Sequence, residues 1–248
     1  MNPIIDAKQI IKSFGYGEEK VVVLKKVSLQ VNAGEFIAIM GASGSGKSTL
    51  LYTLSAIEDL DSGEVIIEQN ELSTLNEDQK ADMRRKKFGF VFQNPTMLKN
   101  LNIIDNIILQ AAYEKNTDKN KLIAEAKVIM AKTGIDGLEN RSITEVSGGQ
   151  LQRAGICRAI LHKPSIIFAD EPTGALDSKS GEDIMKLFSN IHKEGMTILL
   201  VTHDSKVASI VDKVLFMKDG EIKEETVLKS STQEDKINEI EEVIKRVL

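Results

Sequence analysis

The stretch "FIAIMGASGSGKST", Phe36 to Thr49, decides the fold. It begins with five apolar residues, and such an unbroken run is typical of a strand buried on both faces of a parallel sheet. The glycine-rich segment that follows has the P-loop pattern G-x-x-x-x-G-K-[ST], and the residues from Thr49 onward begin a helix. A strand, a glycine loop and a helix in this order predict an α/β fold with a P-loop core.

The residues of this loop suit a polyphosphate. Glycines let the backbone curl so that successive N–H groups face an anion. Lys47 adds a cation near the β- and γ-phosphates, and the Ser48 hydroxyl suits Mg²⁺. We therefore predict that a nucleoside triphosphate binds with Mg²⁺ at this loop, which comprises Gly41, Ala42, Ser43, Gly44, Ser45, Gly46, Lys47, Ser48 and Thr49.

Two further apolar runs end at polar residues. Ile166 to Ala169 is followed by Asp170 and Glu171, and Ile198 to Val201 is followed by Thr202 and His203. In open α/β sheets, ligands bind beyond the carboxyl ends of the strands, so three strand ends point to one site. Asp170 is predicted to hold Mg²⁺. The carboxylate of Glu171 is predicted to orient and deprotonate an attacking water.

The remaining pattern gives the organisation of the chain. Short β-rich pieces dominate the first part and predict an antiparallel β region, whereas the stretch from Thr96 to Ile160 has helical spacing and predicts an α-helical insertion. The turn Asp219–Gly220 predicts a hairpin near the end, and the last twenty residues form an amphipathic helical pattern. The β-rich pieces are Ile4–Ile11, Val21–Leu24, Val27–Val31 and Val65–Glu68.

A second glycine-containing stretch, "EVSGGQLQRAGICRAI" from Glu145 to Ile160, has two explanations. Ser147 and Gln150 form the pattern S-x-x-Q of a capping box, which alone accounts for a helix start. Gly148 and Gly149 are not needed for a cap, and they suit close approach of an anion to exposed N–H groups. Spacing alone leaves these two explanations equally good.

Composition excludes several classes of protein. The net charge of −5 over 248 residues does not suggest a nucleic-acid footprint, which is normally basic. The single cysteine, Cys157, rules out an internal disulfide and sits at helical spacing among apolar residues, so we expect a buried thiol. The first residues lack the features of a signal peptide, and no apolar run approaches the roughly 20 residues that cross a bilayer. We expect any membrane association to depend on another chain.

The motifs in their order resemble those of ATP-binding cassette (ABC) proteins. "SGGQLQR" from Ser147 resembles the signature sequence, and "GALD" from Gly174 to Asp177 resembles the D-loop. Gln93 after "FGFVF" looks like the Q-loop glutamine, which senses Mg²⁺ and the γ-phosphate, and His203 looks like the switch histidine. Phe14 looks like the aromatic residue that stacks on adenine, with Tyr16 close enough to compete.

The resemblance implies a role for each of these residues. The catalytic set is Glu171, His203, Lys47 and Gln93, and the Mg²⁺ set is Ser48, Gln93 and Asp170. The nucleotide-binding set adds to the P-loop the residues Phe14, Gln93, Asp170, Ser147, Gly148, Gly149, Gln150 and Asp177. It also implies one ABC ATPase domain over 1–248, with a catalytic core of 1–92 and 161–228, a helical subdomain of 93–160 and a C-terminal helical tail of 229–248.

Members of this family work as head-to-tail dimers. Each copy offers its signature residues to the ATP bound by the P-loop of the other copy, so the resemblance implies a second copy of this chain as a partner. A membrane permease is expected to dock near Gln93 to Leu101, which would place the chain in the cytoplasm at the inner face of the membrane.

The motif sequences look most like the MacB/lipoprotein-release group of ABC ATPases. Within that group they look closest to the ATPases of antimicrobial-peptide (bacitracin-type) resistance or export, so we expect ATP hydrolysis to power export of such a peptide or of a lipophilic compound. The alternatives are a lipoprotein-release ATPase, a division-type ATPase that signals across the membrane without transport, and a soluble ABC ATPase with no membrane partner.

Overall fold

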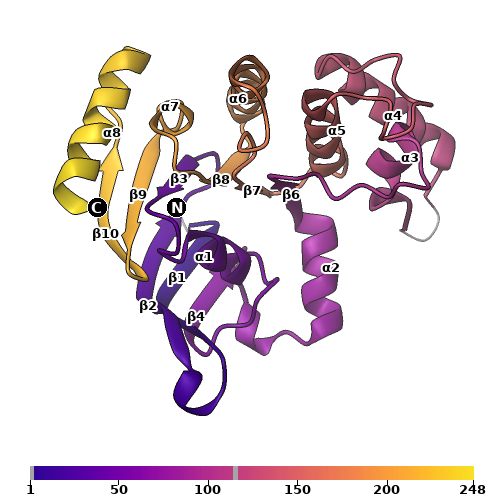
Figure 1. The fold of residues 1–248 in the computed structure, drawn as a ribbon. Helices are drawn as coiled ribbons and strands as arrows, with labels where there is room; N and C mark the ends of the chain where they lie inside the picture. The colour runs from indigo at the N-terminus through magenta and orange to yellow at the C-terminus, as the bar shows by residue number, and fades with distance from the viewer. Residues whose placement is uncertain (1–2, 114–116) are drawn as a thin grey trace. The chain divides into compact units, whose positions relative to one another are not determined.

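The computed structural model describes residues 3–113 and 117–248 (Figure 1). The chain divides into two compact units, Met1–Asp82 with Ile191–Leu248, and Met83–Asn190. Helices α2 (Glu77–Lys87) and α6 (Ser178–Lys193) contain the points at which the chain passes between them. The predicted α/β class is confirmed, and the finer division into core, helical subdomain and tail stays a prediction.

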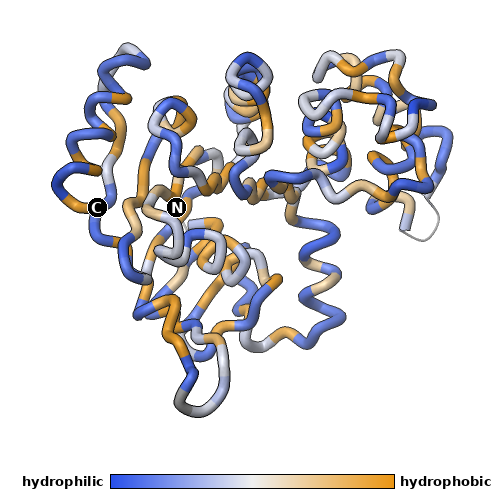
Figure 2. The backbone as a smooth tube through the Cα atoms, in the orientation of Figure 1, coloured by the Kyte–Doolittle hydropathy of each residue, from blue (hydrophilic) through white to orange (hydrophobic). Residues whose placement is uncertain are grey.

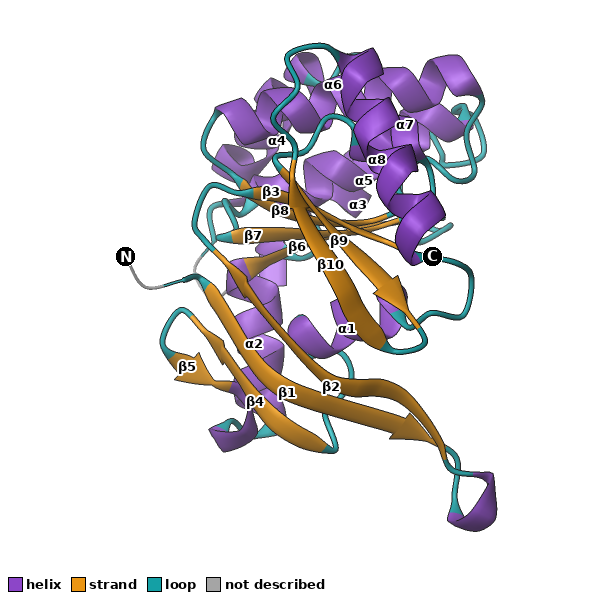
Figure 3. Cartoon of the chain, turned by 90° about the vertical axis from the view of Figure 1, so that its left-hand side faces the viewer, coloured by secondary structure: helices purple, strands orange, loops and turns teal. Residues whose placement is uncertain are grey.

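The first unit contains a four-stranded antiparallel sheet in the order β2-β1-β4-β5 (Figure 3). The two segments predicted around Lys26 form one continuous strand, because the chain passes Lys26 with a φ of 59° and irregular register instead of breaking. The 3₁₀ turn η1 (Gly17–Glu19) joins the first two strands. The strands are β1 (Ile5–Phe14), β2 (Val21–Val31), β4 (Ser62–Ile67) and β5 (Asn70–Glu71).

The same unit contains the parallel strands that carry the P-loop. Strand β3 (Phe36–Met40) is fully buried and lies between β8 (Thr197–Val201) and β9 (Lys213–Lys218), parallel to both. Strand β10 (Glu221–Val227) pairs antiparallel with β9. Asp219 and Gly220 join them with φ of 52° and 83°, the two positive values that a tight hairpin turn requires.

Helices complete this unit. Helix α1 (Lys47–Leu54) follows the P-loop, η2 (Leu72–Thr74) follows β5, and the short α7 (Ser205–Ala208) follows β8. The C-terminal α8 (Gln233–Val247) buries Ile240 and Val243 and contacts α7 and β9. The amphipathic tail therefore packs on its own unit.

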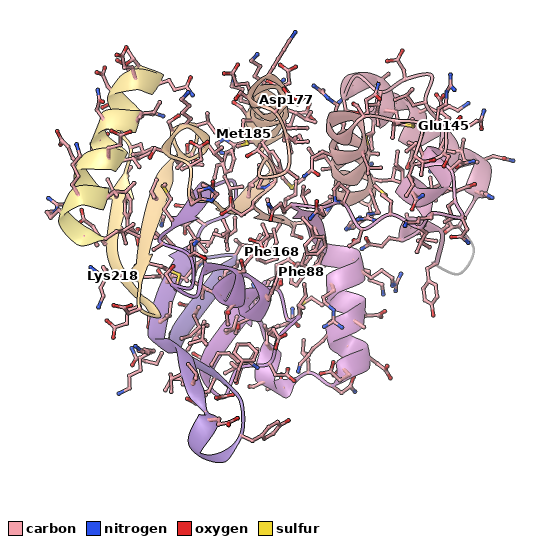
Figure 4. The ribbon with its side chains drawn as sticks, viewed as in Figure 1. Phe88, Glu145, Phe168, Asp177, Met185 and Lys218 are labelled. Atoms are coloured by element: carbon pink, nitrogen blue, oxygen red, sulfur yellow. The ribbon has the colours of Figure 1, made fainter. Side chains whose placement is uncertain are left out.

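The second unit combines two parallel strands with a group of helices. Strand β6 (Phe88–Phe92) pairs in parallel with β7 (Ile166–Asp170), and the rings of Phe88 and Phe168 meet edge to face at 5.2 Å (Figure 4). A separate apolar core holds α3 (Ile103–Ile108), α4 (Lys119–Lys132) and α5 (Gly148–Leu161) together, with the 3₁₀ turn η3 (Ala111–Tyr113) after α3. The predicted helical insertion is confirmed.

Helix α2 differs from these packed helices. None of its residues is buried, and Figure 2 shows it as predominantly hydrophilic. Its last turn contains the basic run Arg84, Arg85, Lys86 and Lys87. Cations are favourable at a helix C-terminus, where they face the negative end of the helix dipole. The basic run is therefore the end of a helix without buried residues.

Candidate functional site

The P-loop requires glycine at three positions. Gly44 and Gly46 have φ of 79° and 99°, a region that other residues rarely adopt. A Cβ atom at Gly41 would lie 2.2 Å from the carbonyl oxygen of Met217. The loop therefore keeps a conformation that requires glycine at these three positions.

Lys47 and Ser45 give this loop its polar character. Lys47 is 8% exposed, and its ammonium donates hydrogen bonds to the carbonyl oxygens of Gly41 at 2.8 Å and Ala42 at 2.9 Å. The buried Ser45 Oγ has no hydrogen-bond partner among residues 3–113 and 117–248. A cation, an orphaned hydroxyl and the start of a helix together suit the phosphates of ATP.

Backbone contacts from distant segments hold the loop in place. Gly220 N donates to the carbonyl oxygen of Ser45 at 3.1 Å, and Lys25 N donates to the carbonyl oxygen of Gly220 at 2.9 Å. A Cβ atom at Gly220 would lie 2.2 Å from the carbonyl oxygen of Val23, so this position also requires glycine. The sequence indicated Gly220 only as a turn residue, and its contact with the P-loop was missed.

His203 leaves the sheet at the same edge as the P-loop. Ile39 pairs with Val201 in neighbouring parallel strands, so Gly41 and His203 follow adjacent strand ends, as predicted. The side chain of His203 is exposed. Next to it, the buried Thr202 Oγ1 accepts a hydrogen bond from Asp204 N at 3.1 Å, which fixes the backbone of this turn.

Two aromatic residues lie beside the end of β1. Phe14 is 42% exposed, and Lys12 Nζ lies 4.9 Å from its ring centroid, so a cation covers one face of this ring. Tyr16 is 95% exposed. Both rings are accessible to a flat ligand, and the choice between them for adenine stays a prediction.

In the second unit, Gln93 and Glu171 also follow adjacent strand ends. Phe92 pairs with Asp170, so the two residues leave β6 and β7 at the same edge. Glu171 has a φ of 46°, an uncommon value for a residue other than glycine and one that is frequent where side chains are held for function. A Cβ atom at Gly174 would lie 2.8 Å from Gln93 Nε2, so Gln93 lies against the segment that follows Glu171.

The signature segment begins α5 with both halves of the predicted capping box. Ser147 Oγ accepts from Gln150 N at 3.2 Å, and Gln150 Oε1 accepts from Ser147 N at 2.8 Å. Ser147 and Gly148 are exposed. The capping explanation is confirmed. The cap uses the N–H groups of Ser147 and Gln150 rather than those of Gly148 and Gly149, so the anion-binding explanation remains compatible with it.

Asp177 has a structural partner in the same unit. Its carboxylate accepts hydrogen bonds from Ser180 N at 3.0 Å and from Ser180 Oγ at 2.7 Å at the start of α6. These bonds hold the pKa of Asp177 below its usual value, with the Ser180 hydroxyl as the largest cause. Ser180 also approaches the signature, since a Cβ atom at Gly149 would lie 3.3 Å from it.

The oxygen donors predicted for a metal fit Mg²⁺. Ser48, Gln93 and Asp170 offer a hydroxyl, an amide and a carboxylate, and Mg²⁺ prefers such hard ligands in small number beside substrate phosphates. The described part of the chain contains no cluster of three His, Cys, Asp or Glu residues that could hold a metal by itself. The donor set therefore suits a metal that arrives with a nucleotide.

Within the ranges that the structure describes, no helix is long and apolar enough to cross a bilayer.

Comparison with known proteins agrees with the motifs. A sequence model of the family "ABC transporter" matches residues 24–174. The bacitracin export ATP-binding protein BceA of Halalkalibacterium halodurans is 44% identical over 220 residues, which cover 88% of this chain and 87% of BceA. The macrolide export ATP-binding/permease protein MacB of Mannheimia succiniciproducens is 43% identical over 223 residues, which cover 90% of this chain and 34% of MacB. The chain thus spans about a third of the length of the MacB relatives that it matches.

A solved structure gives the same result. The ATP-binding cassette MJ0796, a dimer in a post-hydrolysis state bound to ADP and Pi, has a TM-score of 0.84 and 36% identity, over 91% of this chain and 99% of that one. The resemblance to the MacB and bacitracin-type group is confirmed by these relatives. The family match extends over more than half of the chain, and the alignment covers 87% of BceA. This chain therefore belongs to the ABC transporter family and is an ATPase cassette of that family.

Proposed function

We propose that two copies of this chain bind ATP between them, head to tail, and hydrolyse it to power a separate membrane permease. The observation that carries the proposal is the exposed start of α5, where Ser147 and Gly148 lie at a helix N-terminus. Such a terminus attracts an anion. The related cassette MJ0796 is itself a dimer bound to ADP and Pi, which supports the arrangement.

Each copy supplies one half of a site. The P-loop holds the phosphates through its backbone N–H groups and Lys47, while Phe14 stacks on adenine. The signature residues Ser147 and Gly148 of the other copy contact the γ-phosphate. When bound, Mg²⁺ neutralises charge on the β- and γ-phosphate oxygens. Ser48, Gln93 and Asp170 would hold it.

Hydrolysis uses Glu171 as the base. Its carboxylate accepts a proton from a water whose oxygen forms a bond to the γ-phosphorus, and the bond from that phosphorus to the β–γ bridging oxygen breaks. The exposed imidazole of His203 donates a hydrogen bond to a γ-phosphate oxygen. ADP and phosphate leave, and because the γ-phosphate alone bridges both copies, its loss favours the open dimer.

The permease docks near Gln93 to Leu101 and holds the ATPase at the inner face of the membrane. Antimicrobial peptides or lipophilic compounds are the proposed cargo, because BceA and MacB are named for export of bacitracin and macrolides. Since both relatives are named as exporters, the division-type alternative is not favoured. The permease carries the cargo specificity, because each motif described above serves the nucleotide.

Two inactive variants test the shared site. Lys47→Ala removes the cation from the P-loop, and Ser147→Arg blocks the signature. In mixed dimers one site combines the intact Lys47 with the intact Ser147, so mixing restores about a quarter of the parent ATPase activity if the copies pair at random. If the mixture stays inactive while each variant still dimerises, the head-to-tail site is wrong.

The control is a chain that carries both substitutions. Mixed with either single variant, it leaves each site with at least one defect, so no activity returns.

Purification of the chain from membranes, together with its bound partner, distinguishes the export function from the division-type function. A many-helix permease with a large extracytoplasmic domain supports export, whereas a four-helix division protein with cell-wall enzymes contradicts it.

A further inference from the structure

Helix α5 lies along β6 with its start near the end of the strand. His162 Nε2, just after α5, lies 3.1 Å from the carbonyl oxygen of Phe88 at the start of β6. At the other end, Gln152 Nε2 donates to the carbonyl oxygen of Phe92 at 3.0 Å. The helix and the strand therefore run in opposite directions, and the signature lies at the end of α5 that is near Gln93.

The chain after Gln93 turns back along the same helix. Pro95 lies against Gly155, where a Cβ atom would be 3.6 Å from the proline ring. Arg158 Nη1 then donates to the carbonyl oxygen of Thr96 at 2.6 Å. Contacts that advance from residue 152 to 155 to 158 follow one face of a helix. Segment 92–97 thus lies on one face of α5, with Gln93 at the point of reversal.

Gln152 is an unusual choice for its position. Its side chain is 1% exposed, and Oε1 has no hydrogen-bond partner within the described residues. A buried acceptor without a partner costs free energy, whereas an apolar side chain of the same length would not leave one. The one bond that the amide does make is to Phe92, so stability alone does not account for a glutamine here.

Arg158 is also a polar side chain that contacts segment 92–97. Burial lowers the pKa of its guanidinium, and its Nη1 lies 3.6 Å from Met97 Sδ in addition to its bond to Thr96. Arg153, five residues earlier on α5, makes a comparable bond of 2.7 Å, but to the carbonyl oxygen of Thr133 at the end of α4. Arg153 can therefore serve as a control for Arg158: it lies on the same helix and makes a similar bond, but not to segment 92–97.

We propose that Gln152 and Arg158 are positioning residues that hold segment 92–97 on α5, so that Gln93 and the signature serine Ser147 move as one body. This inference rests on the proposed role of Gln93 at the Mg²⁺–ATP site. It implies that a change at Gln93, whether from nucleotide or from a permease docked on the following residues, reaches the signature through side chains of α5 rather than along the intervening chain.

The test compares Gln152→Met and Arg158→Met with Arg153→Met in the full chain. ATP hydrolysis is measured against Mg²⁺ concentration, together with ATP affinity of the isolated chain and thermal unfolding. We expect the first two variants to raise the half-saturating Mg²⁺ concentration by about threefold or more with ATP affinity unchanged, because the defect lies in positioning rather than in the P-loop. Arg158→Lys, which keeps one donor, is expected to recover part of the shift.

Backbone amide exchange gives an independent measurement. Residues 92–97 are expected to exchange faster in Gln152→Met and Arg158→Met than in Arg153→Met, because local opening no longer breaks a side-chain hydrogen bond. A Mg²⁺ dependence and an exchange pattern equal to those of Arg153→Met would overturn the proposal.

The variant Gln93→Ala shows whether a negative result concerns only the positioning role of Gln152 and Arg158 or also the role of Gln93 at the Mg²⁺–ATP site. If Gln93→Ala shifts the Mg²⁺ dependence and the two α5 variants do not, only the positioning role is wrong. If Gln93→Ala leaves the dependence unchanged, the role of Gln93 is wrong and the positioning role is rejected with it.

Discussion

The ammonium of Lys47 donates a hydrogen bond of 2.8 Å to the carbonyl oxygen of Gly41, at the other end of the same P-loop. The charge is thus held over the loop rather than extended into solvent. Binding a triphosphate places oxygens of opposite charge at the same position, and a charge-assisted bond is stronger than a bond to a neutral carbonyl. The loop therefore holds its cation ready for phosphate.

Lys47→Ala is expected to weaken ATP binding. Loss of one charge-assisted hydrogen bond costs about 1.5–3 kcal/mol, which corresponds to a rise in Kd of roughly ten- to a hundredfold. Calorimetric titration of the monomeric chain measures it, and Lys127→Ala on the exposed face of α4 is the control. An unchanged Kd would show that the P-loop assignment is wrong.

Glu171→Gln is expected to retain ATP binding and to lower hydrolysis by about a hundredfold or more, because the amide cannot accept the proton of the attacking water. The ATP-bound dimer should then accumulate and be visible by size-exclusion chromatography. Glu182→Gln, at an exposed position of α6, controls for the change of charge. Normal turnover in Glu171→Gln would exclude this residue as the base.

Substitutions at Ser147 separate capping from anion binding. Aspartate caps a helix as well as serine does, so Ser147→Asp keeps the fold but repels a γ-phosphate, and we expect turnover to fall by about a hundredfold or more. Ser147→Ala loses the cap at a cost of about 1 kcal/mol but leaves the helix N–H groups available, and its turnover should fall less. If Ser147→Asp is the more active of the two, capping is the only role of this serine.

Gly174→Ala is expected to displace Gln93. The added Cβ would lie 2.8 Å from Gln93 Nε2, the mobile end of a side chain, so the fold can adjust while the amide moves. We expect kcat to fall with thermal stability unchanged, whereas Ala175→Ser at the next, exposed position should behave like the parent. Parent-like kcat in Gly174→Ala would show that hydrolysis tolerates displacement of Gln93.

Cys157 is expected to resist thiol reagents. The side chain is fully buried and its Sγ lies 3.0 Å from Thr133 Oγ1. Burial disfavours the charged thiolate and raises the pKa of Cys157 to about 12, so the reactive form is scarce at neutral pH. Alkylation at pH 8 should be negligible in the folded chain and complete in denaturant. Rapid labelling of the folded chain would contradict this environment.

Much of the fold could be predicted because some strands are recognisable from their own residues alone. The runs at Phe36, Ile166 and Ile198 are apolar at nearly every position, and each forms a strand of a parallel pair. Strand β6 was not predicted, because Gly89, its second residue, weakens the pattern. The structure explains this glycine: a Cβ atom there would lie 2.6 Å from the carbonyl oxygen of Ala159 in α5.

Contacts between residues that are distant in the sequence could not be predicted from it. The ring of His192 packs on Phe36, and its Nε2 lies 2.9 Å from the carbonyl oxygen of Gly34. The sequence separation of these residues leaves no local pattern. The site residues themselves were recognisable because phosphate chemistry needs particular residue types in a particular order.

The turn at Gly220 determines which residues of the hairpin between β9 and β10 can be substituted. It meets Ser45 and Lys25 through main-chain atoms, so the attachment does not depend on which side chains the neighbouring hairpin carries. Relatives could therefore exchange the flanking residues Lys218 and Glu221 to suit other surroundings while the geometry of the phosphate cradle stays intact. Substitution of Gly220 itself, although it touches no substrate, would distort that cradle.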